Sequence, residues 1–150
     1  MDWEIVRERM QNLTGYDAFV DLALELSGRN VAGIFDFLFS EAIAGGRTGG
    51  LAARLLIEID PAPTRTCKAL LSEVAHSTWD VSTKEVPFFF ISWFGKHGLI
   101  EAYQLFIEEA DLNAEQKQRV GTILYWTAGP AAQLIRSYHD WPWCEVDDLN

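Results

Sequence analysis

The residues best placed to hold a metal ion are Glu73 and His76, which lie three positions apart on a predicted helix. That spacing puts both side chains on one helical face. The di-iron sites of helical bundles need two Glu-x-x-His motifs and two further carboxylates. Neither His97 nor His139 has a Glu three residues before it, so half of such a site is missing. We therefore expect no metal and no cofactor, and interpret His76 as a residue at a helix C-terminus, where a charged imidazole is favourable.

The possible nucleophiles also lack the partners that catalysis requires. A Cys–His pair needs its two groups within hydrogen-bond reach. Cys67 falls on an apolar helical stripe, which predicts a buried free thiol. Cys144 lies near His139 only along the chain, and the sequence has no Gly-x-Ser-x-Gly turn. His97 continues an apolar stripe and is interpreted as a structural residue, so we do not expect an enzyme.

A glycine-rich segment at residues 45–50, Gly-Gly-Arg-Thr-Gly-Gly, precedes a predicted helix. A helix N-terminus can bind an anion. The segment is not a Walker loop, because Leu51 stands where that motif requires Lys and no strand is predicted before it. We interpret it as a turn between helices.

Tryptophan in acidic loops is the pattern that most favours a binding function. Trp79 lies in a predicted loop, and Trp141 and Trp143 lie in a C-terminal segment without periodicity. A large apolar side chain surrounded by charge is typical of anchor residues in protein interfaces. The alternative is that the indoles fill grooves between helices. The predicted partner-binding residues are Trp79, Asp80, Glu85, Asp140, Trp141, Trp143, Glu145, Asp147 and Asp148.

Composition indicates one domain with a sizeable core. The chain has 150 residues, 49% of them hydrophobic, and no apolar run long enough to cross a membrane. The net charge is −10, from 12 Lys and Arg against 22 Asp and Glu. This balance argues against binding to nucleic acids or to anionic membranes, and favours a partner with a basic surface. Two cysteines do not form a disulfide framework, and the N-terminus lacks the features of a secretion signal, so we expect a cytoplasmic protein.

Hydrophobic periodicity predicts an all-α fold of about eight to nine short antiparallel helices. The segments 82–85 and 113–116 match the capping-box pattern of helix starts. The segment 31–44 is apolar nearly all round and is expected to be central. The helices are expected at about 2–11, in a stretch ending at 27, and at about 31–44, 48–59, 64–76, 82–94, 99–110, 113–128 and 131–138.

The predicted helices form a single domain over residues 1–150, in which 139–150 is a non-periodic acidic tail that contains tryptophan. Short turns between neighbouring helices are typical of an irregular helical bundle. Two helix–turn–helix units of similar length also indicate a short HEAT-like α-solenoid, and both architectures stay open.

With these features the chain resembles the small, acidic, all-helical immunity proteins of bacterial toxin–immunity pairs. The resemblance rests on size, charge, the helical pattern, the loop-borne Trp beside Asp and Glu, and the stretch from Trp79-Asp-Val to Glu85-Val-Pro-Phe-Phe. Such proteins bind and block a toxin domain encoded beside them. The resemblance therefore implies a protein-binding inhibitor that covers a basic toxin active site. Immunity proteins share no diagnostic motif, so no site residue is transferred from them.

Two other functions stay open. One is a structural adaptor or homo-oligomeric helical subunit, which a large exposed apolar face on the segment 31–44 or 82–94 would favour. The other is a small-ligand-binding enzyme that uses His76, Glu73 and His97 around a pocket between helices.

Overall fold

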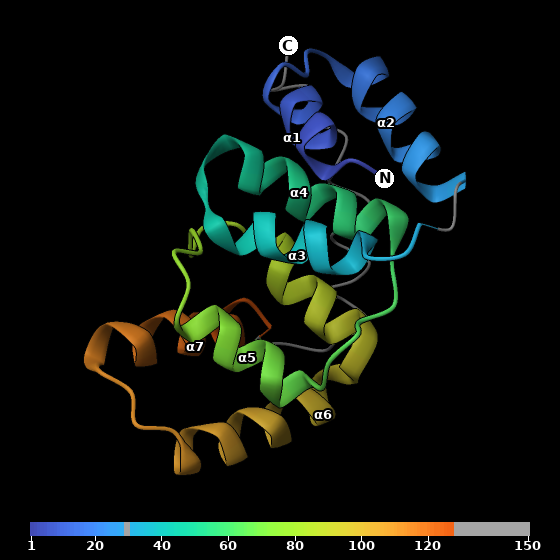
Figure 1. Ribbon diagram of the computed structural model, residues 1–150. Helices are drawn as coiled ribbons and strands as arrows, with labels where there is room; N and C mark the ends of the chain where they lie inside the picture. The colour runs from blue at the N-terminus through green and yellow to red at the C-terminus, as the bar shows by residue number, and fades with distance from the viewer. Residues whose placement is uncertain (29–30, 128–150) are drawn as a thin grey trace.

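The computed structural model describes residues 1–28 and 31–127, and in these ranges the chain is all-helical, as predicted. Figure 1 shows the helices as two groups on either side of a central pair, α3 and α4. The helices are α1 (Trp3–Gln11), α2 (Tyr16–Gly28), α3 (Ile34–Ala44), α4 (Gly46–Ile59), α5 (Cys67–Ala75), α6 (Glu85–Glu109) and α7 (Ala114–Trp126).

The described ranges contain seven helices, whereas eight to nine were expected for the whole chain, and the difference has two reasons. The helices predicted at 82–94 and 99–110 are the two arms of α6, which is interrupted at Gly95. Gly95 has φ 73° and ψ 158°, a conformation that is essentially restricted to glycine because it has no Cβ. The helix predicted at 131–138 lies outside the described residues.

One predicted capping box is confirmed and the other is wrong. The Asn113 side chain accepts the backbone N–H of Gln116, and the Gln116 side chain accepts that of Asn113, so that α7 starts with a complete box. At α6 the N-cap is Lys84, which makes no side-chain capping bond. Ser82 instead bonds to Asp80 in the preceding loop. The polar residues of this loop stabilise the loop itself rather than the helix start.

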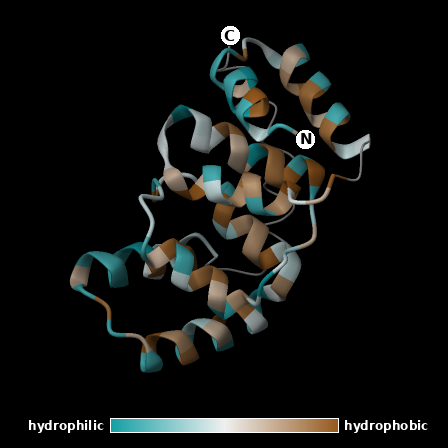
Figure 2. Cartoon of the chain, in the orientation of Figure 1, coloured by the Kyte–Doolittle hydropathy of each residue, from teal (hydrophilic) through white to brown (hydrophobic). Residues whose placement is uncertain are grey.

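The core is centred on α3, as its all-round apolar character predicts. Aromatic rings of α3 and α6 meet there. The rings of Phe35 and Phe89 are stacked, with their centroids 5.7 Å apart. The rings of Phe39 and Phe90 pack edge to face, with their centroids 6.2 Å apart. Trp3 of α1 stacks on Phe37 at 4.6 Å. Figure 2 shows the apolar residues, in brown, along α3 and α4. The buried residues of α3 are Phe35, Phe37, Leu38, Phe39, Ala42 and Ile43.

The remaining helices pack around this centre. Both α1 and α2 contact α4, and they lie together at one end of the molecule (Figure 1). On the other side α4 contacts α6, α5 packs on α6, and α7 packs on both α5 and α6. None of the described helices combines the length and apolar character needed to cross a membrane.

Candidate protein-binding surface

Trp79, predicted as an exposed anchor, lies in the core. Only 3% of the residue is exposed, and it belongs to the main hydrophobic cluster. Its indole N–H has no acceptor among residues 1–28 and 31–127. The expectation of an exposed Trp79 is therefore wrong. The physical reason is that the short loop between α5 and α6 passes over apolar side chains, where burying an indole is favourable even at the cost of its N–H.

Glu85 is also not a surface charge. It lies in the first turn of α6, is 6% exposed, and has an oxygen 4.0 Å from Nε of Arg54. A buried carboxylate needs a cationic partner to offset its desolvation, and the helix N-terminus adds a favourable field. The exposed position expected for Glu85 is wrong for this reason.

Asp80 is exposed, as expected. One oxygen of its carboxylate accepts the Ser82 hydroxyl at 2.7 Å and the Ser82 backbone N–H at 3.0 Å. These two bonds lower the pKa of Asp80, so the residue carries its charge at neutral pH. The other predicted binding residues, Asp140, Trp141, Trp143, Glu145, Asp147 and Asp148, lie outside the described residues, and their role stays a prediction.

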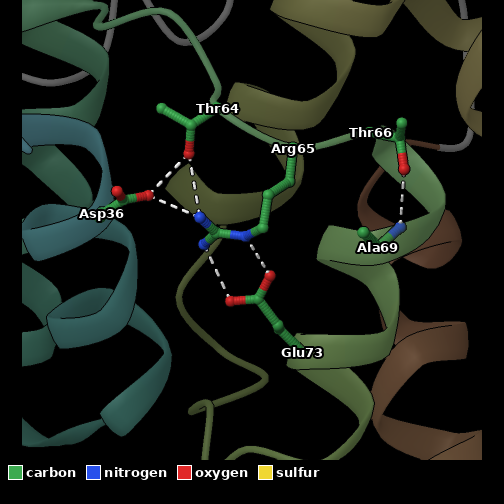
Figure 3. A network of polar contacts seen from close by, with 6 residues as sticks. All are labelled: Asp36, Thr64, Arg65, Thr66, Ala69 and Glu73. Atoms are coloured by element: carbon green, nitrogen blue, oxygen red, sulfur yellow. Dashed lines mark hydrogen bonds and ion pairs between the residues drawn. The ribbon is translucent and has the colours of Figure 1, made fainter.

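The polar groups of the enzyme alternative are engaged in local bonds. The Glu73 carboxylate accepts two N–H donors from Arg65 (Figure 3). His76 is the C-cap of α5, as interpreted, and its Nδ1 lies 2.8 Å from the Ser72 carbonyl. His97 is exposed on α6, so the expectation that it is partly buried along the apolar stripe of this helix is wrong. The described ranges hold no cluster of three or more His, Cys, Asp or Glu side chains that could bind a metal ion.

The glycine-rich segment 45–50, interpreted as a turn between helices, is a turn only at Gly45, because residues 46–50 already belong to α4; for those residues the interpretation is wrong. Arg47, in the first turn of α4, reaches to the end of α1. The guanidinium donates to the carbonyls of Leu13 at 2.6 Å and Gln11 at 3.1 Å. These bonds cap α1, whose last carbonyls have no partner in their own helix.

A small polar pocket of about 250 Å³ adjoins the loop between α5 and α6. Trp126 closes one side, and its indole N–H donates to the Val81 carbonyl at 2.7 Å. Trp126 is half-buried, packs against the hydrophobic core and ties the end of α7 to the loop. The lining residues are Gly50, Arg54, Ser82, Thr83, Lys84, Glu85 and Trp126.

The basic side chains are used largely to join helices. Arg7 of α1 binds Glu41 of α3, and Lys68 of α5 binds Glu109 of α6. The Glu41 and Glu4 carboxylates raise the pKa of Arg7 further above its already high value. Arg119 of α7 donates to the carbonyl of Ala75 at the end of α5, at 2.8 Å. Much of the positive charge of the described residues is thereby paired within the fold.

Many acidic side chains have no such partner. Exposed carboxylates that form neither an ion pair nor a side-chain hydrogen bond with any described residue are those of Glu8, Asp17, Asp21, Glu58, Glu101, Glu108 and Asp111. Among the described residues, the surplus of negative charge therefore lies at the surface.

A groove of about 450 Å³ between α1 and α2 combines this charge with apolar surface. Ile5 of α1 lines it and is 60% exposed, and Leu24 of α2, on the same face as Asp21, is 66% exposed. This groove could not be predicted from the sequence, because Ile5 lies off the buried face of α1 and an isolated exposed apolar residue carries little signal. The lining residues are Ile5, Glu8, Arg9, Asn12, Leu13, Thr14, Ala18 and Asp21.

Comparison of the chain with protein-family models, with curated proteins and with solved structures finds no match.

Proposed function

We propose that this protein binds a basic protein and inhibits it by covering its active site, in the manner of an immunity protein. The observation that carries the proposal is the placement of charge. Basic side chains such as Arg7 and Lys68 are paired between helices, whereas acidic ones such as Glu8 and Asp21 face outward unpaired. A surface of this kind attracts a basic partner over distances comparable to the Debye length, about 10 Å at moderate salt.

Two sets of observations favour a binding inhibitor over the alternative functions, an enzyme and an adaptor. Glu73, a member of the proposed catalytic set, is held by Arg65 through both carboxylate oxygens. The adaptor alternative depended on an exposed apolar face of the segment 31–44 or 82–94, and the large apolar residues of α3 are buried except Ile34, which is half-buried. On α6, Trp93 is partly exposed, but its indole N–H donates to Asp60 at 2.7 Å, which fixes it locally.

The proposal includes a HEAT-like arrangement of helix pairs. The second helix of each pair contacts the second helix of the next, since α2 contacts α4 and α4 contacts α6. Repeats that stack through neighbouring units build extended binding surfaces.

A cytoplasmic location is also part of the proposal, and the free thiol of Cys67 supports it because reducing compartments keep thiols unpaired.

The direct test is capture of the partner followed by an inhibition assay. The tagged full-length protein is incubated with lysate of its source cells at low and high salt, and the retained proteins are identified by mass spectrometry. We expect one basic protein, retained at low salt and depleted at high salt, whose purified form loses activity when the inhibitor is added in equal amount.

An unrelated helical protein of the same net charge is the control bait. If it retains the same proteins, attraction by charge alone explains the result and the proposal fails. A captured protein that stays fully active in the saturated complex also rejects inhibition.

A further inference from the structure

The groove between α1 and α2 has an apolar floor and an acidic rim. Leu13, which is nearly buried, and Ala18 form the floor, and the exposed side chain of Ile5 stands beside it. Glu8 of α1 and Asp21 of α2 lie on opposite helices along the rim. Figure 2 shows that hydrophilic (teal) and apolar (brown) residues both occur along α1 and α2. Apolar surface flanked by charge of one sign predicts an apolar ligand flanked by the opposite sign.

The one cation in the groove is already neutralised. Arg9, the only basic side chain among the lining residues, pairs with Glu25 of α2 at 2.5 Å. This ion pair therefore links α1 to α2. Glu8 and Asp21 form no ion pair with the described residues, so the net charge along the groove is negative.

We infer that this groove seats an amphipathic helix of the basic partner, with an apolar side chain over Ile5 and Leu13 and with Lys or Arg facing Glu8 and Asp21. The inference rests on the proposed function and names the surface and the shape that the partner presents. A third helix packs readily into the groove between two others, because the side chains of helices form ridges and grooves that interlock. The known helix-in-groove mode uses this geometry.

An extended segment fits the groove less well. Strand addition requires unpaired backbone N–H and C=O groups along an edge, whereas α1 and α2 bond their backbone groups internally. The side-chain amide of Asn12 donates one of its two N–H groups to the Glu8 carbonyl at 3.0 Å, which leaves one N–H donor for a ligand. Recognition therefore depends on side chains, which a helix presents on one face.

The test uses a synthetic peptide of about 14 residues with Leu on one helical face and Lys on the others. A peptide of the same composition in scrambled order is its control. Chemical-shift changes in the labelled full-length protein locate the binding site, and fluorescence anisotropy gives the affinity. We expect the periodic peptide to shift resonances of α1 and α2, and the scrambled peptide to bind at least about tenfold more weakly.

Charge reversal provides matched protein variants. The variant Glu8→Lys with Asp21→Lys changes the groove, and Glu101→Lys with Glu108→Lys makes the same change of charge on exposed positions of α6. We expect the first pair to weaken peptide binding at least about tenfold and the second less than about threefold.

Shifts spread over other acidic surfaces, equal weakening by both variants, or no binding of the peptide would each overturn the groove as docking site. None of these results affects the capture of a basic protein by the whole surface, which tests the proposed function separately. Conversely, a charge-matched control bait that retains the same proteins would reject the proposed function whatever the peptide does.

Discussion

The guanidinium of Arg65 holds the carboxylate of Glu73 through two N–H donors, from Nε to Oε2 at 2.6 Å and from Nη2 to Oε1 at 2.9 Å (Figure 3). The same guanidinium donates to Asp36 of α3 at 2.5 Å and lies over the Phe35 ring, 5.6 Å from its centroid. Arg65 stands in the segment that joins α4 to α5. It therefore links three parts of the chain that are distant in sequence.

Arg65→Lys should destabilise the fold by about 1 kcal/mol. Lysine keeps the charge but cannot form the planar fork that binds both oxygens of Glu73. The partial exposure of the pair limits the loss. Urea unfolding followed by circular dichroism measures the free energy. Lys117→Arg, on the exposed face of α7, is the control and should leave it within about 0.5 kcal/mol. Equal stability of Arg65→Lys and the unchanged protein would show that the fork contributes nothing.

The stability of the fold should fall in acid partly through Asp36. The Thr64 hydroxyl and the Arg65 guanidinium lower the pKa of this carboxyl in the folded protein. A lowered pKa contributes stability above the unfolded-state pKa of about 3.9, and this contribution is lost as the pH falls through the folded-state value. The slope of unfolding free energy against pH below about pH 4 should be shallower in Asp36→Asn. An unchanged slope would contradict the role of Asp36.

Gly45→Ala and Gly50→Ala should act in opposite directions. Gly45 has φ +84°, and a Cβ there would lie 2.7 Å from the Thr78 carbonyl oxygen. Strain and overpacking together should cost at least about 2 kcal/mol. A Cβ at Gly50, inside α4, meets no atom within 4 Å, so alanine should stabilise the helix by about 0.4 to 1 kcal/mol. Thermal unfolding of the two variants measures both changes in stability. A Gly45→Ala variant as stable as the unchanged protein would contradict the close packing of the Thr78 backbone against Gly45.

Cys67 should react only when the protein unfolds. Burial raises the pKa of its thiol to about 12, so the nucleophilic thiolate is scarce at neutral pH. The Cys144→Ser variant leaves Cys67 as the only thiol of the chain. Its labelling by a disulfide reagent should be at least about a thousandfold slower in buffer than in urea, because the reagent reaches Cys67 only when the protein unfolds. Rapid labelling under native conditions would place the thiol at the surface.

Helix positions could be predicted because the signals are local. The all-round apolar character of the segment 31–44 predicted a central helix, and the polar pair Asn113 and Gln116 marked the start of α7; both predictions are confirmed. The free, buried Cys67 was likewise predicted from its apolar stripe, and is confirmed.

The surface could not be predicted in the same way, because burial of loop residues depends on contacts distant in sequence. Trp79 and Glu85 lie in or beside a polar loop, and only the approach of that loop to the core and to Arg54 of α4 determines their burial. The groove at Ile5 arises because α1 and α2 both rest on α4, which no local pattern indicates.

The most direct test of the central claim is a titration calorimetry experiment with the full-length protein and its purified partner in a salt series. If an unpaired acidic surface binds a basic protein, the affinity should fall at least about tenfold between about 50 and 300 mM NaCl, with one-to-one binding and loss of partner activity at saturation. An affinity that does not change with salt would contradict the account, and so would a partner that stays active in the complex.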